Sequence, residues 1–260
     1  MRNAIFILSL LWTIGVRAQN RIEWETNYGG SSQDQANAVR QTADGGYVAA
    51  GRSLSSDGDL SGNYGGEDIW VVKTGADGVL QWQHHFGGSA DERAEDIIQT
   101  FDGGYVVAGY SRSSDGDVGG NNGSWDMWIL KLDAAGDLEW ERNYGGSNND
   151  LAYCIRQTLD TGFVIAGSSQ SNNGDVGANF GNADYWVVKT DAAGNIQWEQ
   201  NYGGNSADVA YSMILTSDSS YVLAGQSQSA NGDVGGNNGA YDYWVLKLNT
   251  SGAILWSHNY

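Results

Sequence analysis

The feature that most constrains this chain is an internal repeat of 58 residues. Five tryptophans recur at that interval, and one lysine and one glycine keep the same spacing through four copies. The recurring residues are Trp24, Trp82, Trp140, Trp198 and Trp256; Lys73, Lys131, Lys189 and Lys247; and Gly51, Gly109, Gly167 and Gly225. A fixed period of this length is typical of repeat architectures, in which each unit packs on its neighbours.

Each unit contains four runs with the character of β-strands. In the second copy they cover 94–100, 105–111, 126–132 and 137–144, and they are rich in β-branched and aromatic residues. The Asp102-Gly103-Gly104 sequence between the first two runs suits the positive φ angles of a tight hairpin. No run shows a sustained helical period, so the chain is predicted to be all-β. Four short strands in a repeated up-and-down meander describe the blade of a β-propeller.

We therefore expect a β-propeller domain over residues 19–260, built from about four four-stranded blades. The repeats cover about 24–81, 82–139, 140–197 and 198–255. Arg21 to Tyr28 is an extra copy of the fourth strand, so the strand count does not close. A closed four-bladed ring with this strand loose or capping an edge is the first interpretation. The alternative is an open stack, completed by a second chain or by further copies, whose unclosed edge strands would allow an oligomer.

The first residues predict a targeting segment. Met1-Arg2-Asn3 is a short positive start, the apolar run 4–16 follows, and Val16-Arg17-Ala18 offers a cleavage site. The run of 13 residues is shorter than the ~20 needed to span a bilayer. Residues 1–18 are therefore predicted to be a signal peptide, which makes the mature protein secreted, either extracellular or at the cell surface, with no membrane span.

Composition excludes several partners and sites. With 31 acidic against 13 basic residues the formal charge is −18, so a nucleic-acid backbone would be repelled. One cysteine rules out an intramolecular disulfide and any cysteine-based metal site. Because Cys154 stands where the other copies have different residues, we expect a free, half-buried thiol.

Residues that recur in every copy are expected to be structural. The third-strand tryptophans (Trp70, Trp128, Trp186 and Trp244) should fill the wedge between blades, and the recurrent glycines should sit where backbones approach closely. The recurrent lysines should reach solvent or pair with an acid of the adjacent blade. A further acidic series, Asp34, Glu92, Asp150 and Asp208, should accept hydrogen bonds from backbone N–H groups in the Gly-Gly-Ser turn.

The Gly/Asn-rich loop before each third strand carries a second acidic pattern. Oxygen-bearing residues at positions 1, 3 and 12 match the spacing of a calcium loop, which makes calcium the candidate cofactor. The candidate ligands are Asp57, Asp59 and Asp68; Asp115, Asp117 and Asp126; Asp175 and Asp184; and Asp233 and Asp242. The competing interpretation is that these side chains only close turns, because no helices flank the loops and glycine replaces a ligand at position 5 in three copies.

The same loops also carry the positions that differ most between copies. Aromatic residues there can stack on sugar rings or anchor a partner protein, or they can simply pack on neighbouring loops. The candidate ligand-binding residues are Tyr64, Trp125, Phe180 and Tyr241.

The motifs W-x-x-N-Y-G-G-S, Q-T-x-D-G-G-Y-V-V-A-G, G-D-V-G-G-N-N-G and D-x-W-V-V-K-L-D-x-x-G resemble repeats of secreted bacterial and archaeal β-propeller proteins. Such proteins are common in Bacteroidetes and related to the seven-bladed propeller and delta-60 repeat groups, and some similar sequences carry a bulb-type lectin label. The resemblance covers residues 22–260. It implies an exported or surface-attached protein without enzymatic activity.

The sequence favours a non-enzymatic binding or scaffold module with a glycan or protein ligand at the cell surface. One alternative is a purely structural repeat array. A propeller enzyme, such as a lyase or hydrolase, would need titratable residues of different types converging on the central channel, and we find no such set among the repeats. No catalytic residues are therefore predicted.

Overall fold

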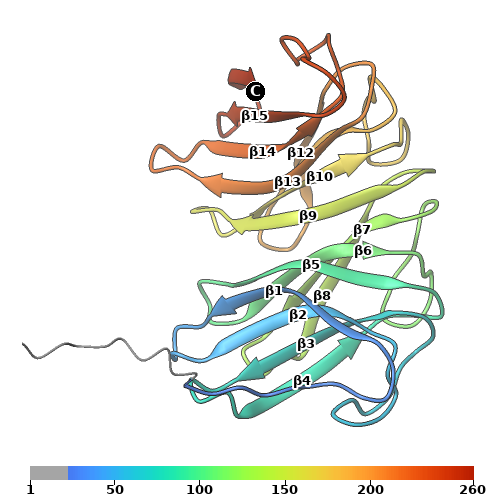
Figure 1. Ribbon diagram of the computed structural model, residues 1–260, viewed down its shortest axis with the longest axis vertical. Helices are drawn as coiled ribbons and strands as arrows, with labels where there is room; N and C mark the ends of the chain where they lie inside the picture. The colour runs from blue at the N-terminus through green and yellow to red at the C-terminus, as the bar shows by residue number, and fades with distance from the viewer. Residues whose placement is uncertain (1–22) are drawn as a thin grey trace, which may run out of the picture.

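The computed structural model describes residues 23–260, and all regular secondary structure in this range is β-strand. The predicted signal peptide, residues 1–18, lies outside the described residues. The sixteen strands form four antiparallel sheets, each a four-stranded meander in chain order (Figure 1). This confirms the predicted all-β fold of four blades.

The strand bounds repeat closely from blade to blade. The first blade is β1 (Asp34–Gln41), β2 (Tyr47–Ser53), β3 (Asp68–Thr74) and β4 (Leu80–Phe86). The second is β5 (Glu92–Gln99), β6 (Tyr105–Ser111), β7 (Asp126–Leu132) and β8 (Leu138–Tyr144). The third is β9 (Asp150–Gln157), β10 (Phe163–Ser169), β11 (Asp184–Thr190) and β12 (Ile196–Tyr202). The fourth is β13 (Asp208–Leu215), β14 (Tyr221–Ser227), β15 (Asp242–Leu248) and β16 (Ile254–Asn259).

The blades lie side by side in chain order and form an open row (Figure 1). The first strand of each later blade packs against the inner three strands of the blade before it: β5 on β1–β3, β9 on β5–β7, and β13 on β9–β11. Among the described strands no comparable packing joins the first sheet to the fourth. The closed four-bladed ring is therefore not formed, and the open stack describes the chain.

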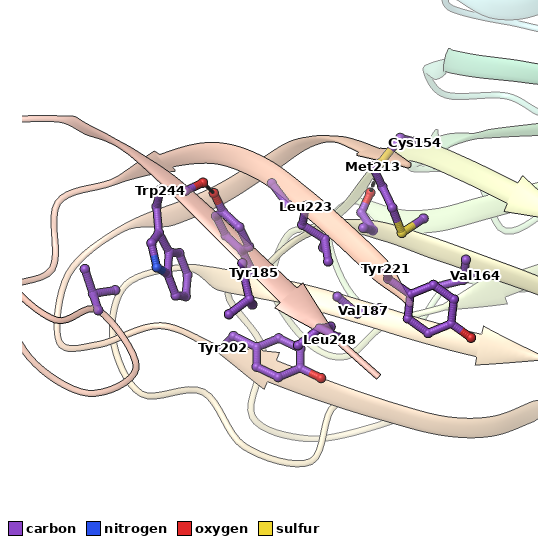
Figure 2. Packing of buried hydrophobic residues seen from close by; sticks show 14 residues of the cluster. Cys154, Val164, Tyr185, Val187, Tyr202, Met213, Tyr221, Leu223, Trp244 and Leu248 are labelled. Atoms are coloured by element: carbon purple, nitrogen blue, oxygen red, sulfur yellow. Dashed lines mark hydrogen bonds between the residues drawn. The ribbon is translucent and has the colours of Figure 1, made fainter. Parts of the chain in front are cut away.

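The core lies between blades. Trp128, Trp186 and Trp244 are fully buried, as their fixed place in the repeat predicted. At the junction of the third and fourth blades, the rings of Tyr185 and Trp244 have their centroids 4.4 Å apart, and the Tyr185 hydroxyl donates a 2.9 Å hydrogen bond to the Trp244 carbonyl (Figure 2). The sequence repeats because each blade must present one apolar face to the blade before it and another to the blade after it.

The recurrent glycines sit where two backbones nearly touch. A bulge in β5 between Ala94 and Asp96 brings that strand against β6, and a Cβ at Gly109 would overlap the carbonyl oxygen of Arg93. The equivalent glycines meet the equivalent carbonyls in the other three blades, at Gly51, Gly167 and Gly225. The predicted reason for these glycines is confirmed, since any side chain there would push the first strand off its sheet.

Two predictions about single residues were wrong. Lys73 is buried, and its Nζ lies 2.8 Å from a carboxylate oxygen of Asp44, in the β1–β2 turn of its own blade rather than the adjacent one. The lysine stands near the end of β3, beside that turn, so its own blade offers the nearest acid. Cys154 is fully buried instead of half-buried, and burial raises the pKa of its thiol to about 12.

The turn between the first and second strands of each blade gives a stability prediction. Gly45 and Gly103 take φ values of 83° and 88° there, but in the third copy the same place holds Thr161 at 67°. A left-handed conformation costs a residue with a Cβ about 1 kcal/mol. Thr161→Gly should therefore raise the free energy of unfolding by up to about 1 kcal/mol in denaturant titration.

Leu159→Gly in the same turn is the control, because Leu159 has no positive φ. It should lower the free energy of unfolding or leave it unchanged. Equal stabilisation by both substitutions would contradict the conformational argument.

Candidate functional site

The structure separates the four predicted ligand-binding aromatics into two groups. Tyr64 lies beside the outer strand of its blade, with its ring 5.0 Å from that of His85 on β4, and Phe180 lines a small pocket with Asn231 and Asp233 of the fourth blade's loop. Trp125 and Tyr241 occupy the last loop position before the third strand, beside the inner strands. The four residues therefore do not form one platform.

Trp125 belongs to a compact group that we call the inner cluster. Its members come from the inner strands and adjoining loop of the second blade and from the first strands of the third and fourth blades. They are Arg93, Glu95, Tyr110, Trp125, Tyr153 and Tyr211.

The aromatic members of the inner cluster touch in series. Tyr110 meets Trp125 edge-on at 5.0 Å between ring centroids, and Tyr110 lies 6.4 Å from Tyr153. Tyr153 in turn lies 5.2 Å from Tyr211 of the fourth blade, which is half exposed. Three blades thus contribute rings to one continuous series of contacts, in which Tyr110 is buried and Tyr211 is half exposed.

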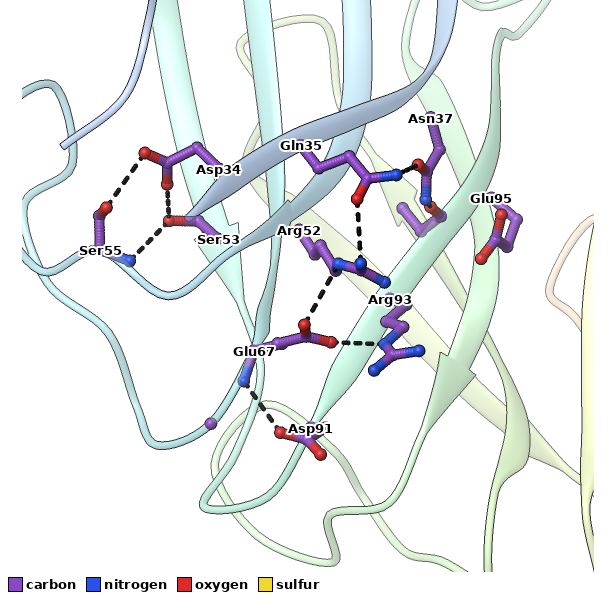
Figure 3. Close-up of polar contacts among 12 residues, drawn as sticks. Asp34, Gln35, Asn37, Arg52, Ser53, Ser55, Glu67, Asp91, Arg93 and Glu95 are labelled. Carbon is purple, nitrogen blue, oxygen red and sulfur yellow. Dashed lines mark hydrogen bonds and ion pairs between the residues drawn. The ribbon is translucent and has the colours of Figure 1, made fainter. Parts of the chain in front are cut away.

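Two guanidinium groups flank the indole of Trp125. Arg93 lies 5.4 Å and Arg112 5.2 Å from its ring centroid, both within cation–π range. Figure 3 shows how Glu67, in the equivalent loop position of the first blade, holds Arg93 at 2.5 Å and Arg52 at 3.2 Å. This strongly acidic protein therefore gathers positive charge beside its inner strands.

Most arginines lie on the inner strands. Of the six arginines beyond residue 22, five lie on the first or second strands of a blade or directly after one: Arg40, Arg52, Arg93, Arg112 and Arg156. Arg40 and Arg156 lie level with the recurrent lysines, since Arg40 pairs with Val48 and Val48 with Lys73, whereas Arg52, Arg93 and Arg112 lie at the opposite strand ends, near Trp125.

A second polar group, centred on Asp96, connects three blades by hydrogen bonds. Asp96 on β5 is buried, and its carboxylate accepts hydrogen bonds from Arg40 of the first blade at 2.5 Å and Arg156 of the third at 2.6 Å. The backbone N–H of Ile155 also donates to it at 3.2 Å. A carboxylate with this many donors is engaged in positioning the inner strands.

The pKa values of Tyr110 and Tyr211 in the inner cluster are raised, so these hydroxyls stay neutral and can donate hydrogen bonds. Burial, followed by the nearby Glu95 carboxylate, raises the pKa of Tyr110 to about 12, and its hydroxyl donates to Glu95 at 2.9 Å. Burial also raises the pKa of Glu95. Burial and then Tyr241 raise the pKa of Tyr211, so the half-exposed hydroxyls at this surface remain donors at neutral pH.

The sequence predicted no convergence of titratable residues of different types on the central channel of a closed ring, whereas the described blades form an open row and gather such residues beside the inner strands. Arg93, Glu95 and Tyr110 meet at the inner strands, and Asp96, the next residue of β5, binds Arg40 and Arg156. The signal was present in the sequence: the position of Glu95 is Asn37, Tyr153 and Tyr211 in the other copies, so the first strand varies between repeats.

The predicted calcium residues lie in two different hydrogen-bonding environments. The first two acids of each loop cap the Gly-Gly-Ser turn: Asp57 accepts from the Ser31 N–H at 2.7 Å and Asp59 from the Gly29 N–H at 2.9 Å. Asp115, Asp117, Asp175 and Asp233 make the equivalent bonds. The last acid closes the loop itself, as Asp68 does by accepting from the Tyr64 N–H at 2.6 Å, and Asp126, Asp184 and Asp242 follow it.

Over residues 23–260, no group of three or more His, Cys, Asp or Glu side chains could hold a metal ion. The loop carboxylates instead make the contacts expected of turn-closing residues. The second acidic series also behaves as predicted, because each member accepts from the N–H of the second turn glycine: Asp34 from Gly30, Glu92 from Gly88, Asp150 from Gly146 and Asp208 from Gly204.

Each junction between blades also contains two buried carboxyl groups facing each other. Asp126 of the second blade and Asp150 of the third are both fully buried, and Asp126 Oδ1 has no hydrogen-bond partner. Burial raises the pKa of Asp126 to about 6, with Asp150 and Asp175 adding to the shift. Asp68 and Asp184 repeat the arrangement, with pKa values raised by burial to about 7.

These carboxyl groups predict a pH dependence. A folded-state pKa raised above the ordinary 3.8 gives stability that is present at low pH and lost as the group ionises, here between about pH 4 and pH 7. Asp126→Asn removes the charge and keeps an acceptor for the Asn122 N–H. It should raise the free energy of unfolding by about 2 kcal/mol at about pH 8 and have little effect at about pH 4.

Asp137→Asn is the matched control, since Asp137 is an exposed turn residue. Chemical unfolding of both variants across this pH range makes the comparison. A loss of stability in Asp126→Asn at high pH, or the same change at every pH, would contradict the buried-carboxyl argument.

The loop geometry also predicts the result of metal removal. Because the carboxylates are occupied by backbone N–H groups, a chelator should leave the unfolding temperature unchanged, and added calcium should not raise it. A cation bound only by the folded state must stabilise it. A rise in unfolding temperature with calcium concentration would therefore support the calcium loops and contradict the turn interpretation.

Comparison with known proteins gives a curated relative and several solved structures. No family model matches the chain. A curated relative, the regulatory protein FlaEY of Caulobacter vibrioides, is 28% identical over 164 residues, which are 57% of this chain and 17% of the relative. The matched part of this chain thus corresponds to less than a fifth of that protein.

Solved structures with a similar course of the chain include the WD40 domain of Neurospora crassa Pan2, with a TM-score of 0.48, 14% identity and coverage of 86% of this chain and 66% of that one. Sqt1 from Chaetomium thermophilum has a TM-score of 0.46, 10% identity and coverage of 89% and 50%. A protein of unknown function from Bacteroides caccae has a TM-score of 0.35, 12% identity and coverage of 87% and 82%. Because these TM-scores are all below 0.5, the evidence for the propeller fold is the four four-stranded sheets of this chain and not the comparison.

No helix in residues 23–260 is long and apolar enough to cross a membrane.

Proposed function

We propose that this protein is a non-enzymatic binding module that is exported to the cell surface or beyond and takes a partner protein or glycan at the inner cluster. The observation that carries the proposal is Trp125, whose half-buried indole is flanked by Arg93 and Arg112 and backed by Tyr110. Trp, Tyr and Arg are the residues that most often dominate the energy of recognition surfaces.

A protein partner fits this composition better than an uncharged sugar. Aromatic rings alone would serve for stacking on a glycan, whereas the guanidinium groups of Arg93 and Arg112 add donors suited to carboxylate or other acidic groups. Part of their charge is balanced by Glu67 and Asp91, which also hold them in position. We therefore favour an acidic segment of a surface protein as ligand, with an acidic glycan as the second candidate.

The mixed residues of the inner cluster do not favour an enzyme. Glu95 is hydrogen-bonded to Tyr110, and Asp96 is held between two arginines, so each acid already has partners. Catalysis would need one of these acids to be released toward a substrate. The export of the protein rests on the sequence of residues 1–18 alone.

The proposal predicts that binding depends on Trp125. The mature protein is screened against a glycan array and a displayed peptide library, and each ligand found is retested with Trp125→Ala. Loss of a central Trp should cost at least about 2 kcal/mol, which is roughly a thirty-fold rise in Kd.

Phe101→Ala is the control, because Phe101 is an exposed aromatic in the β5–β6 turn, outside the inner cluster. Its Kd should equal that of the unchanged protein. Ligands that bind equally well to Trp125→Ala, or that bind only through Tyr64 or Phe180, would place recognition elsewhere and refute the proposal.

A further inference from the structure

The two terminal blades expose faces that are buried in every interior junction. On the first blade, Val39 is 58% exposed, whereas its equivalents Ile97 and Ile155 are fully buried under the preceding blade. On the fourth blade, Tyr243 is 77% exposed, whereas its equivalents Met127 and Tyr185 are fully buried under the following blade. Each terminal blade thus presents one half of the interface that joins all the others.

The two exposed halves complement each other residue by residue. In the third junction the Tyr185 ring packs against the Trp244 ring at a tilt of 49°, and its hydroxyl donates to the Trp244 carbonyl. The repeat places the exposed Tyr243 in the position of Tyr185, and Trp70 in the position of Trp244, although Trp70 is buried in this chain and belongs to a cluster on which Tyr28 packs. The remaining exposed side chains of the fourth blade include Ile214, which is 56% exposed, while the first blade offers an apolar pocket lined by Val39, Ala49 and Val72 among others.

We propose that a second copy of this chain docks head to tail, with the fourth blade of one copy on the first blade of the next. The contact continues the three interfaces already formed within the chain, so it needs no new kind of surface. Because the two surfaces differ, the contact is heterologous and produces a closed ring or an extended series of copies. Burial of the same aromatic and aliphatic side chains supplies the driving force.

Residues 23–28 control access to this contact. Trp24 packs on Tyr47 with ring centroids 5.8 Å apart, as Trp82 packs on Tyr105 at 5.5 Å in the next junction. The Tyr28 hydroxyl donates to the Gly78 carbonyl, as Tyr144 and Tyr202 donate to the equivalent glycines. These residues therefore occupy the place of a preceding blade's fourth strand, where β16 of an incoming copy would lie, so the segment must leave before a second copy can dock.

The test uses two variants that each disable one end. Val39→Asp puts a charge on the first blade's exposed face, and Tyr243→Asp puts one on the fourth blade's exposed face. Mass in solution is measured by analytical ultracentrifugation over a range of concentrations. The unchanged mature protein should associate with rising concentration, and each variant alone should remain a single chain.

A mixture of the two variants gives the sharpest outcome. Each variant retains one intact end of opposite kind, so the mixture should form a one-to-one dimer and nothing larger. Leu159→Asp, on an exposed turn away from both faces, should associate like the unchanged protein. A single-chain mass for the unchanged protein at every concentration would overturn the proposal, as would association of all three variants alike.

Trp24→Ala tests the role of residues 23–28. Weakening that segment should shift association to lower protein concentration. Weaker association in this variant would overturn the idea that the segment and β16 compete for one place.

Discussion

The interface between neighbouring blades is the interaction on which the rest of this structure depends. A four-stranded sheet with an apolar face on both sides cannot bury either of them alone, and here the third-strand tryptophans of the second to fourth blades are fully covered only by the preceding blade. The 58-residue repeat in the sequence follows from that requirement. Stability in such an array comes from each unit and from contacts with its nearest neighbours.

The same requirement explains where function can vary. The third-strand tryptophans and the second-strand glycines such as Gly109 are fixed by packing, so they keep their identity from copy to copy. The first strand of each blade has one stretch that faces neither neighbouring sheet fully, and there the copies diverge into Asn37, Glu95, Tyr153 and Tyr211. The inner cluster, where we propose that a partner binds, includes these divergent positions.

Much of the fold was predictable because local signals agreed. Periodicity, Asp-Gly-Gly turns and β-branched runs indicated the second and third strands of the second blade at 105–111 and 126–132, where the structure has them. The role of Gly109 followed from its recurrence. The partner of Lys73 was not predictable, because sequence spacing does not show that the end of β3 lies beside the turn of its own blade.

The inner cluster was harder to foresee for a similar reason. Trp125 was selected as a loop aromatic, but its association with Arg93 and Tyr110 depends on how the loop before β7 returns to the start of β5. Likewise, the open row could not be deduced from strand counting, since the extra strand Arg21 to Tyr28 is compatible with a closed ring that leaves it loose and with an open stack. These features depend on the angle between sheets, which short-range patterns do not encode.

Hydrogen exchange resolved by blade tests the central claim most directly. If interfaces between blades hold the structure together, then in dilute single chains the amides of the second and third blades, which have two neighbours each, should be the most protected. The first and fourth blades, with one interface each, should exchange faster and open first. Equal protection across all four blades, or greater protection in the terminal ones, would show that each sheet is stable without its neighbours and would contradict the account.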